Sequence, residues 1–260
     1  MARQAFEVTS DVTLVVTSCA RFELLRRTLE SFARHNTYPV RSCILTEDSG
    51  NEAVFDALPE GWREHTQVLL NRPKLGQILS IDQAYRLVTT PYIFHCEDDW
   101  EFQRPGFVED SKIALESSAD TLQVWLRSYY HDLRIHSPFH GLAAREVQQG
   151  VAFYQLTSDK SDWQGFSFNP GLRRLTDYQR LGSYASSGGE EKAVARWYAQ
   201  RGYRAVILEN DAVAHTGWEE HVVTASDRAK RKRRERLSRQ RAVWFLFIGL
   251  AAGWALGVFW

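Results

Sequence analysis

Short, almost fully apolar runs alternate with amphipathic stretches through the first hundred residues. Residues 12–19 (VTLVVTSC) have the length and β-branched composition of a strand that is buried on both faces. The next stretch repeats apolar residues at helical spacing, with Leu25, Leu29 and Phe32 on one face. Further strand-like runs cover 42–50, 66–71 and 91–96, and helical spacing returns over 76–88. This alternation predicts an α/β fold with a doubly wound, mostly parallel sheet.

The pattern is less regular after residue 120. Residues 122–133 predict a strand and the segment that leaves it. Residues 186–202 predict a helix that Ser187 or Gly188 would cap, with two glutamates in its first turn. Residues 203–208 predict a last strand.

Carboxylates gather directly after two of the predicted strands. Glu47 and Asp48 follow one strand, and Glu97, Asp98 and Asp99 follow another. Ligands of open α/β sheets bind at the carboxyl ends of the strands. Three consecutive carboxylates repel one another, and Mg²⁺ or Mn²⁺ would offset that repulsion while it also binds substrate phosphates. The alternative is that these acids cap helices or lie in solvated turns, and it stays open for Asp48.

The order of these motifs resembles the nucleotide-sugar glycosyltransferases of the GT-A fold, and those of family 2 in particular. The resemblance spans residues 11–222 and rests on acid-acid-Ser-Gly after the second strand, NRPKLGQ (71–77) and EDDW (97–100). It implies transfer of a sugar from a nucleoside-diphosphate sugar to an acceptor hydroxyl, with inversion at the sugar. A processive polymerase is disfavoured, because Ala193 stands where processive synthases carry the Gln of Gln-x-x-Arg-Trp.

The same resemblance implies roles for individual residues. Asp48 would contact the nucleoside, Asp98 and Asp99 would bind ribose and metal, and His215 in AVAHTGW would be a further metal ligand. The donor-binding candidates are Ser18, Asp48, Asp82 and Asp98, and the candidate ligands of Mg²⁺ or Mn²⁺ are Asp98, Asp99 and His215. The alternative for His215 is a hydrogen-bonded histidine of the core.

The resemblance also implies a general base at the start of a late helix. Glu191 matches that position, and Glu190 is the second candidate catalytic residue. The alternative is that both glutamates only stabilise the N-terminus of a helix through its dipole. The chain departs from the family at Cys96, where the family carries an Asp, and at Ile81-Asp82, where it carries an Arg-Asn pair.

Residues 242–260 (AVWFLFIGLAAGWALGVFW) contain no charged side chain. As a helix they would span about 28 Å, close to a bilayer core of roughly 30 Å. The preceding basic run fits the positive-inside rule, so we expect a C-terminal transmembrane helix and a cytoplasmic catalytic domain. The alternative is a buried or interfacial helix. Gly249, Gly253 and Gly257 form a small-residue stripe through which two tails could pair as a homodimer.

The distribution of charged residues along the chain limits the classes of partner that it can bind. Residues 228–241 hold nine Lys or Arg and one Glu, a net +8, and the chain as a whole is neutral, so the remainder carries −8. A mildly acidic body with one short basic run is not typical of a nucleic-acid-binding domain, whose basic residues would spread over a folded face. The three cysteines show no CxxC spacing and predict buried, reduced thiols. The expected organisation is a catalytic domain over 1–226, a basic linker over 227–241 and the membrane helix over 242–260.

Two other functions remain open at this level. One is a metal-dependent nucleotidyl or phosphoryl transferase, although no P-loop pattern follows the first strand. The other is a non-catalytic protein that binds nucleotide sugars at a membrane, which would keep Asp48 and the fold but lack a working base. The expected partners are a nucleoside-diphosphate sugar, a glycan or lipid-linked acceptor, and the membrane.

Overall fold

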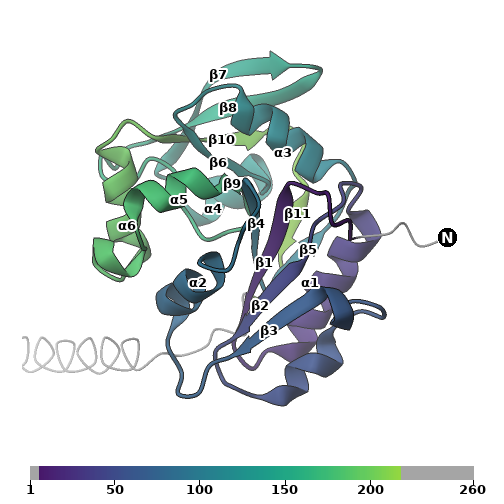
Figure 1. Ribbon diagram of the computed structural model, residues 1–260. Coiled ribbons are helices and arrows are strands. Elements are labelled where there is room, and N and C mark those ends of the chain that lie inside the picture. Colours follow the sequence, from purple (N-terminus) through teal and green to yellow (C-terminus); the bar gives the residue numbers. More distant parts are fainter. Residues whose placement is uncertain (1–5, 218–260) are drawn as a thin grey trace, which may run out of the picture. The chain divides into compact units, whose positions relative to one another are not determined.

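A five-stranded sheet with the order β3-β2-β1-β4-β9 forms the centre of the computed structural model, which describes residues 6–217 (Figure 1). Strands β1 to β4 run parallel, as expected, and β9 runs antiparallel to β4. The strands are β1 (Val12–Ser18), β2 (Cys43–Glu47), β3 (Thr66–Leu70), β4 (Tyr92–Glu97) and β9 (Gly171–Arg174). Because the parallel strands share one direction, their carboxyl ends meet at one edge of the sheet.

Helices cover both faces of this sheet. Alternate residues of β1 point to opposite faces, so Leu14 and Val16 join the core under α1 and α3, whereas Val15 joins the core under α2, α5 and α6. The helices are α1 (Phe22–His35), α2 (Gln77–Tyr85), α3 (Phe107–Glu116), α5 (Leu175–Leu181) and α6 (Glu191–Ala199). All seven residues of β1 are buried, which explains the nearly continuous apolar run.

A second sheet, with the order β6-β10-β8-β7, accounts for much of the irregular middle of the chain. Its strands are β6 (Thr121–Trp125), β7 (His140–Gln148), β8 (Val151–Ser158) and β10 (Arg204–Leu208). β10 runs parallel to β6 but antiparallel to β8, so the expectation of a mostly parallel sheet holds for the central sheet alone. β7 is largely exposed and has no apolar run that would have predicted it.

Short elements complete the described chain. β5 (Trp100–Phe102) pairs with β11 (Val213–His215) in a two-stranded antiparallel sheet. The remaining pieces are α4 (Arg134–His136), a π-helical turn at Tyr129–Leu133, and 3₁₀ turns at Glu52–Ala57, Arg63–His65 and Ala185–Ser187. Cys43 and Cys96 are buried, as expected, but Cys19 is only partly buried.

The predicted cap of the late helix is wrong. α6 begins at Glu191, and its N-cap is Glu190, not Ser187 or Gly188. Gly188 and Gly189 have φ of 122° and 72°, in a region that glycine adopts readily, and they interrupt the chain between the turn at Ala185–Ser187 and the helix. The two glutamates therefore stand at the very start of the helix, at the end of a glycine loop.

Within residues 6–217, no helix is long and apolar enough to cross a bilayer. The predicted membrane helix at 242–260 and the basic linker before it lie outside the described residues. Their assignment stays a prediction from the sequence.

Candidate active site

Two strands, β2 and β4, bring the predicted acids to one edge of the central sheet, on either side of β1. The pairing of β1 with its neighbours sets Ser18 beside Glu47 and Thr17 beside Glu97. Ser18 is buried, and its hydroxyl has no hydrogen-bond partner among the described residues. The structure thus brings the acids that follow β2 and β4 to the same edge, as their positions after the strands predicted.

Arg21, which directly precedes α1, binds both aspartates of the EDDW motif. Its Nη2 contacts Asp98 Oδ1 and its Nε lies 3.3 Å from Asp98 Oδ2, so the guanidinium holds this carboxylate in a two-point contact. Its Nη1 lies 2.8 Å from Asp99 Oδ2. The backbone N–H of Cys19 also donates to Asp98 Oδ2, at 3.3 Å. Both aspartates are buried, and the guanidinium of Arg21 offsets their mutual repulsion.

The two aspartates respond differently to this surrounding. Burial raises the pKa of Asp98 to about 6, although the charge of Arg21 opposes that rise. Burial also acts to raise the pKa of Asp99, but the hydrogen bond from His215 and the charge of Arg21 outweigh it and lower the value. Asp99 is therefore the member of the pair that keeps its negative charge most firmly.

His215 reaches Asp99 because β11 pairs with β5. In that pairing His215 lies opposite Trp100, and the two rings make an edge contact with their centroids 4.9 Å apart. His215 Nε2 lies 3.3 Å from Asp99 Oδ2, and the backbone N–H of Thr216 donates to the Asp99 carbonyl at 2.8 Å. The three predicted metal ligands therefore do lie together, and their role as ligands stays a prediction.

The donor atoms of this cluster fit a divalent cation in part. Asp99 Oδ1 is buried and has no hydrogen-bond partner within residues 6–217, and oxygen is the ligand that Mg²⁺ and Mn²⁺ prefer. His215 would add an imidazole nitrogen. Asp98 does not fit as arranged, because Arg21 and the Cys19 N–H engage both of its oxygens. No group of three or more His, Cys, Asp or Glu in the described part of the chain is arranged to hold a metal ion.

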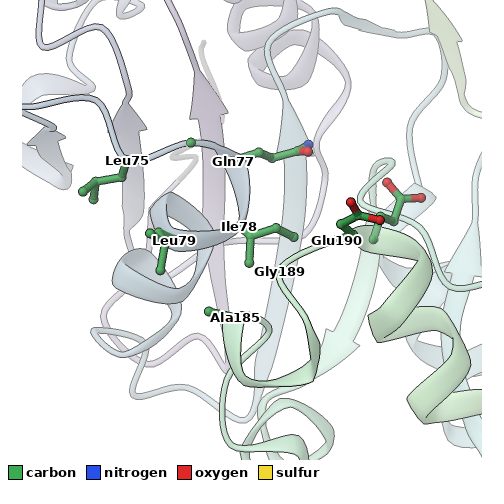
Figure 2. A pocket seen from close by; sticks show the side chains of 9 residues that line it. Leu75, Gln77, Ile78, Leu79, Ala185, Gly189 and Glu190 are labelled. Carbon is green, nitrogen blue, oxygen red and sulfur yellow. The ribbon is translucent and has the colours of Figure 1, made fainter. Parts of the chain in front are cut away.

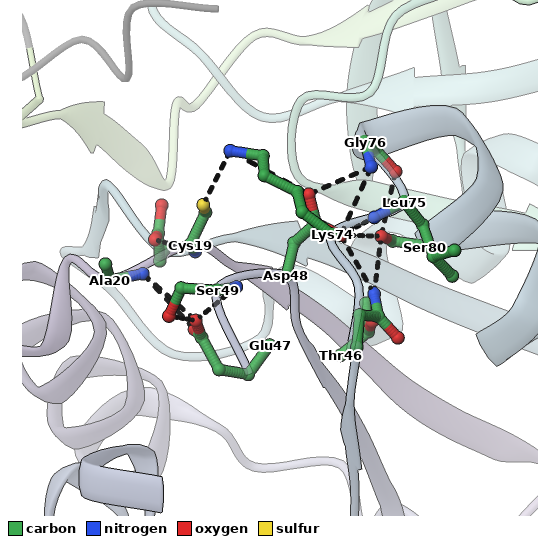
Figure 3. Close-up of polar contacts among 12 residues, drawn as sticks. Cys19, Ala20, Thr46, Glu47, Asp48, Ser49, Lys74, Leu75, Gly76 and Ser80 are labelled. Atoms are coloured by element: carbon green, nitrogen blue, oxygen red, sulfur yellow. Dashed lines mark hydrogen bonds and ion pairs between the residues drawn. The ribbon is translucent and has the colours of Figure 1, made fainter. Parts of the chain in front are cut away.

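Asp48 fixes the loop that leads into α2 (Figure 3). Its Oδ1 accepts hydrogen bonds from the Leu75 backbone at 2.8 Å and from the Ser80 hydroxyl at 3.0 Å. Its Oδ2 accepts one from the Gly76 backbone at 2.9 Å, and the Asn71 amide donates to Oδ1 at 3.0 Å. Both oxygens are thus engaged by the protein. Asp48 shapes this loop, and its expected contact with a nucleoside stays a prediction.

Two further side chains complete this edge (Figure 3). Glu47 is fully buried and accepts hydrogen bonds from the backbones of Ala20, at 3.1 Å, and Ser49, at 2.8 Å. Lys74, whose side chain is half exposed, places its Nζ 3.1 Å from Cys19 Sγ. Lys74 therefore brings a solvent-accessible positive charge to the carboxyl end of β1.

Asp82 joins α2 to the segment that precedes α6. Its side chain is buried and accepts hydrogen bonds from the Tyr178 hydroxyl at 2.9 Å and from the backbones of Tyr184 and Ala185 at 2.8 and 2.9 Å. In this arrangement the carboxylate is engaged by the protein on both oxygens. Its expected contact with the donor stays a prediction, and its observed contacts position the segment that leads to Glu191.

Glu191, the first residue of α6, lies near enough to Glu97 for their charges to interact. Burial raises the pKa of Glu191 to about 7, against the opposing positive charges of Arg173 and Arg127. Burial, followed by the charges of Asp99 and Glu191, raises the pKa of Glu97 well above its ordinary value. A carboxylate with a pKa near 7 can accept a proton at neutral pH, which is what a general base requires.

A cleft of about 410 Å³ opens beside Glu190 and Glu191 (Figure 2). Residues 75–79, at the start of α2, line one side, and Ala185 with residues 189–191 lines the other. Gln77 lines the cleft and donates a hydrogen bond from its Nε2 to Glu97 Oε1 at 2.8 Å. Glu97 in turn lies 3.4 Å from the indole N–H of Trp100. A line of contacts therefore joins the cleft to the cluster around Asp99.

The cations of this site, Arg21 and Arg127, and the amide of Gln77 were not predicted from the sequence. Arg21 stands directly after the first strand, where a positive charge faces the carboxyl edge, and that position was a usable signal. Arg127 was not a candidate, yet it is buried, pairs with Asp132 at 2.6 Å and packs over the Trp100 ring at 5.4 Å. Gln77 lies in the motif NRPKLGQ but carries no charge that would have singled it out.

No protein-family model and no curated protein sequence matches this chain. Solved structures do match its fold. One is the mannosyltransferase PcManGT from Pyrobaculum calidifontis in complex with GDP-Man and Mn²⁺, with a TM-score of 0.56 and 15% sequence identity. The match covers 80% of this chain and 58% of PcManGT.

A second match is S. aureus TarS 1–349, with a TM-score of 0.58, 12% identity, and coverage of 79% of this chain and 60% of TarS. The same protein in complex with UDP matches with a TM-score of 0.53 and 11% identity, over 78% of this chain and 59% of that one. The chain thus spans less than two thirds of these neighbours. The matches confirm the expected GT-A-like fold of nucleotide-sugar glycosyltransferases.

Proposed function

We propose that this chain is a non-processive, inverting glycosyltransferase that moves a sugar from a nucleoside-diphosphate sugar to an acceptor hydroxyl. The observation that carries the proposal is Glu191, a carboxylate whose pKa burial raises to about 7, on the wall of a cleft that Gln77 links by a hydrogen bond to Glu97 at the carboxyl edge of the sheet. Neighbours of the same fold in complex with GDP-Man and with UDP support the class of donor.

Glu191 acts as the general base. It accepts the proton of the acceptor hydroxyl while that oxygen attacks the anomeric carbon from the side opposite the diphosphate. The new glycosidic bond forms as the bond to the diphosphate oxygen breaks, and the nucleoside diphosphate leaves with the electron pair. The charges of Arg127 and Arg173 limit the rise in the pKa of Glu191, so that part of it is deprotonated at neutral pH.

Side chains near the carboxyl ends of β1 and β4 would bind the negatively charged diphosphate of the donor. Lys74 offers a half-exposed ammonium at the carboxyl end of β1, suited to contact a phosphate. Asp99, through its Oδ1, and His215 would hold a divalent cation. Such a cation, when bound, supplies Lewis-acid neutralisation of the departing diphosphate. Arg21 keeps Asp98 and Asp99 at their positions on the sheet edge.

The experiment that tests the function is a panel of nucleotide sugars, including GDP-mannose and several UDP-hexoses, incubated with the purified full chain with and without Mn²⁺. Release of free nucleoside diphosphate, dependent on Glu191, supports the proposal. Release of pyrophosphate would instead mean nucleotidyl transfer. Binding of a donor with neither product would make the chain a nucleotide-sugar-binding protein.

We also propose that the catalytic domain works at the cytoplasmic face of a membrane, held by residues 242–260. The support is the charge-free apolar run and the +8 stretch before it. Deletion of residues 242–260 should move the protein from the membrane pellet to the soluble fraction with its donor binding intact. Recovery of the truncated chain only as insoluble aggregate would contradict a membrane role for the tail.

A further inference from the structure

The cleft beside Glu191 has an apolar wall that nothing in the proposed chemistry explains. Leu75 and Leu79 line it, and they are 38% and 46% exposed. Figure 2 shows Leu75 and Leu79 on one side of the start of α2, and Gln77 and Ile78 on the side toward Glu190. Isolated exposed leucines are ordinary, but leucines that share one cleft with a catalytic candidate mark a contact surface for a ligand.

These leucines are not part of the core. α2 buries Ile81, Ala84 and Tyr85 against the sheet, whereas neither Leu75 nor Leu79 packs into a core cluster of the described residues. They remain in contact with water unless a ligand covers them. Covering apolar surface is favourable by about 25 cal/mol per Å².

Both walls leave room for such a ligand. Gly76 and Gly189 line the cleft on opposite sides with φ of 86° and 72°. A Cβ added at either position would meet no atom within 4 Å, so both glycines face open space. The backbone on each side can therefore be approached closely.

The polar part of the lining selects against an anionic ligand. Among residues 6–217, the charged side chains that line the cleft are Glu190 and Glu191, and no Lys or Arg of this part of the chain joins them. A phosphate at this position would face two carboxylates with no compensating cation in the wall. A neutral, hydroxyl-bearing group can instead bond to Gln77 and to the glutamates.

We infer that the acceptor is an amphiphile with a neutral hydroxyl-bearing headgroup and an aliphatic chain, such as a neutral glycolipid. The inference rests on the proposed function, because it takes Glu191 as the base that meets the acceptor hydroxyl. The headgroup lies at Gln77 and Glu191, and the chain lies along Leu75 and Leu79. The sequence adds an independent reason: residues 242–260 are predicted to hold the protein at a bilayer, where such acceptors are concentrated.

The test uses methyl, butyl and hexyl glycosides of glucose, galactose and mannose as acceptors, all below their micellar concentrations. Each methylene that leaves water contributes about 0.8 kcal/mol, which is roughly a fourfold gain in binding. For the full wild-type chain we expect kcat/KM, and affinity by calorimetry, to rise at least tenfold from methyl to hexyl. Leu79→Gln should remove most of this dependence on chain length.

Leu87→Gln is the matched control. Leu87 is 42% exposed, a similar fraction, and follows the same helix, but it does not line the cleft. This variant should keep the wild-type dependence on chain length, and any partitioning of the glycosides into detergent is common to all three proteins. An equal loss in both variants would mean a non-specific contact and would overturn the inference.

Failure of the inference and failure of the proposed function are distinguishable. Transfer that is indifferent to chain length in the wild type overturns the amphiphile and leaves the glycosyltransferase. Chain-length-dependent binding that Leu79→Gln abolishes, in a protein that releases no nucleoside diphosphate from any donor, upholds the apolar acceptor wall and removes the proposed reaction.

Discussion

Two pairs of acidic side chains lie at the same edge of the sheet but have different surroundings. Asp98 and Asp99 share the guanidinium of Arg21, which contacts both carboxylates. Glu97 and Glu191 interact with each other, and burial raises the pKa of both. The polar contacts of Glu97 are the neutral amide of Gln77 and the indole of Trp100.

The difference shows that the position of a cation, more than the number of acids, decides what a crowded acidic site can do. Asp99, which both Arg21 and His215 contact, has a lowered pKa and keeps its charge, whereas burial raises the pKa of Asp98 to about 6 in spite of Arg21. A carboxylate that is buried without such contact holds a proton near neutral pH and can exchange it. Asp99, with its contacts to Arg21 and His215, therefore defines a charge-binding half of the site, and Glu97 with Glu191 defines a proton-transferring half.

The largest expected effect comes from the proton-transferring half. Glu191→Gln should lower turnover by about 10² to 10⁴, the range for loss of a general base, while donor affinity stays within a few-fold. Wild-type turnover should rise with pH through about 7, because the base must be deprotonated. Transfer assays across pH beside calorimetry with the donor measure both quantities. Glu190→Gln is the control, and a larger loss in that variant would transfer the role of base to Glu190.

Removal of Arg21, the cation that Asp98 and Asp99 share, should lower the stability of the fold. Arg21→Gln leaves two buried carboxylates without their guanidinium, and breaking a buried ion pair costs about 3–5 kcal/mol. Arg27→Gln is the control: Arg27 lies in α1, 3.9 Å from Glu101, and both side chains are largely exposed, so the cost there is below about 1 kcal/mol. Denaturant unfolding measures both variants. Equal stabilities would show that Arg21 does not hold the aspartates together.

In the charge-binding half, we expect Asp99 to be needed for metal-dependent binding of the donor. Asp99→Asn removes the ionised oxygen that has no protein partner in the described chain, so Mn²⁺-dependent donor binding should weaken by roughly 100-fold. His215→Ala should weaken it less, because water can take the position of one ligand. Calorimetry with donor, with Mn²⁺ and with chelator measures the difference. If Asp99→Asn binds donor and Mn²⁺ as the wild type does, the cation lies elsewhere.

The smallest effect tests whether burial, rather than a partner, sets the pKa of Glu191. A folded-state pKa raised to about 7 means that the folded protein gives up stability as pH rises from about 4.5 through 7. Glu191→Gln should therefore be more stable than the wild type by about 1–2 kcal/mol at pH 8, after allowance for solvent screening, and equal to it at pH 4. Thermal unfolding at the two pH values measures the gain. A variant that is less stable at pH 8 would mean that the charge has a favourable partner.

The sequence predicted the four parallel strands of the central sheet, because each leaves an apolar run and β1 and β2 are buried on both faces. It did not predict β9, the antiparallel fifth strand. The sequence also predicted the acids at the sheet edge, because parallel strands have their carboxyl ends at one edge of the sheet. It did not predict the contact of Arg21 with Asp98, 77 residues away, because a long-range ion pair leaves no periodic signal. The β7–β8 hairpin was missed because β7 has few buried positions, and the cleft was missed because it forms only when α2 meets the glycine loop.

The carboxylate of Asp82 acts as an anchor shared by two walls. It belongs to α2, whose first turn is one side of the cleft, and it holds the backbone at Tyr184 and Ala185, where the other side begins. Hydrogen bonds to a charged group are worth about 1.5–3 kcal/mol each, so spreading the walls means breaking several of them at once. The distance between the apolar wall and Glu191 is therefore fixed by the folded chain before any substrate arrives, and a substrate must match this spacing because the walls will not adjust to it.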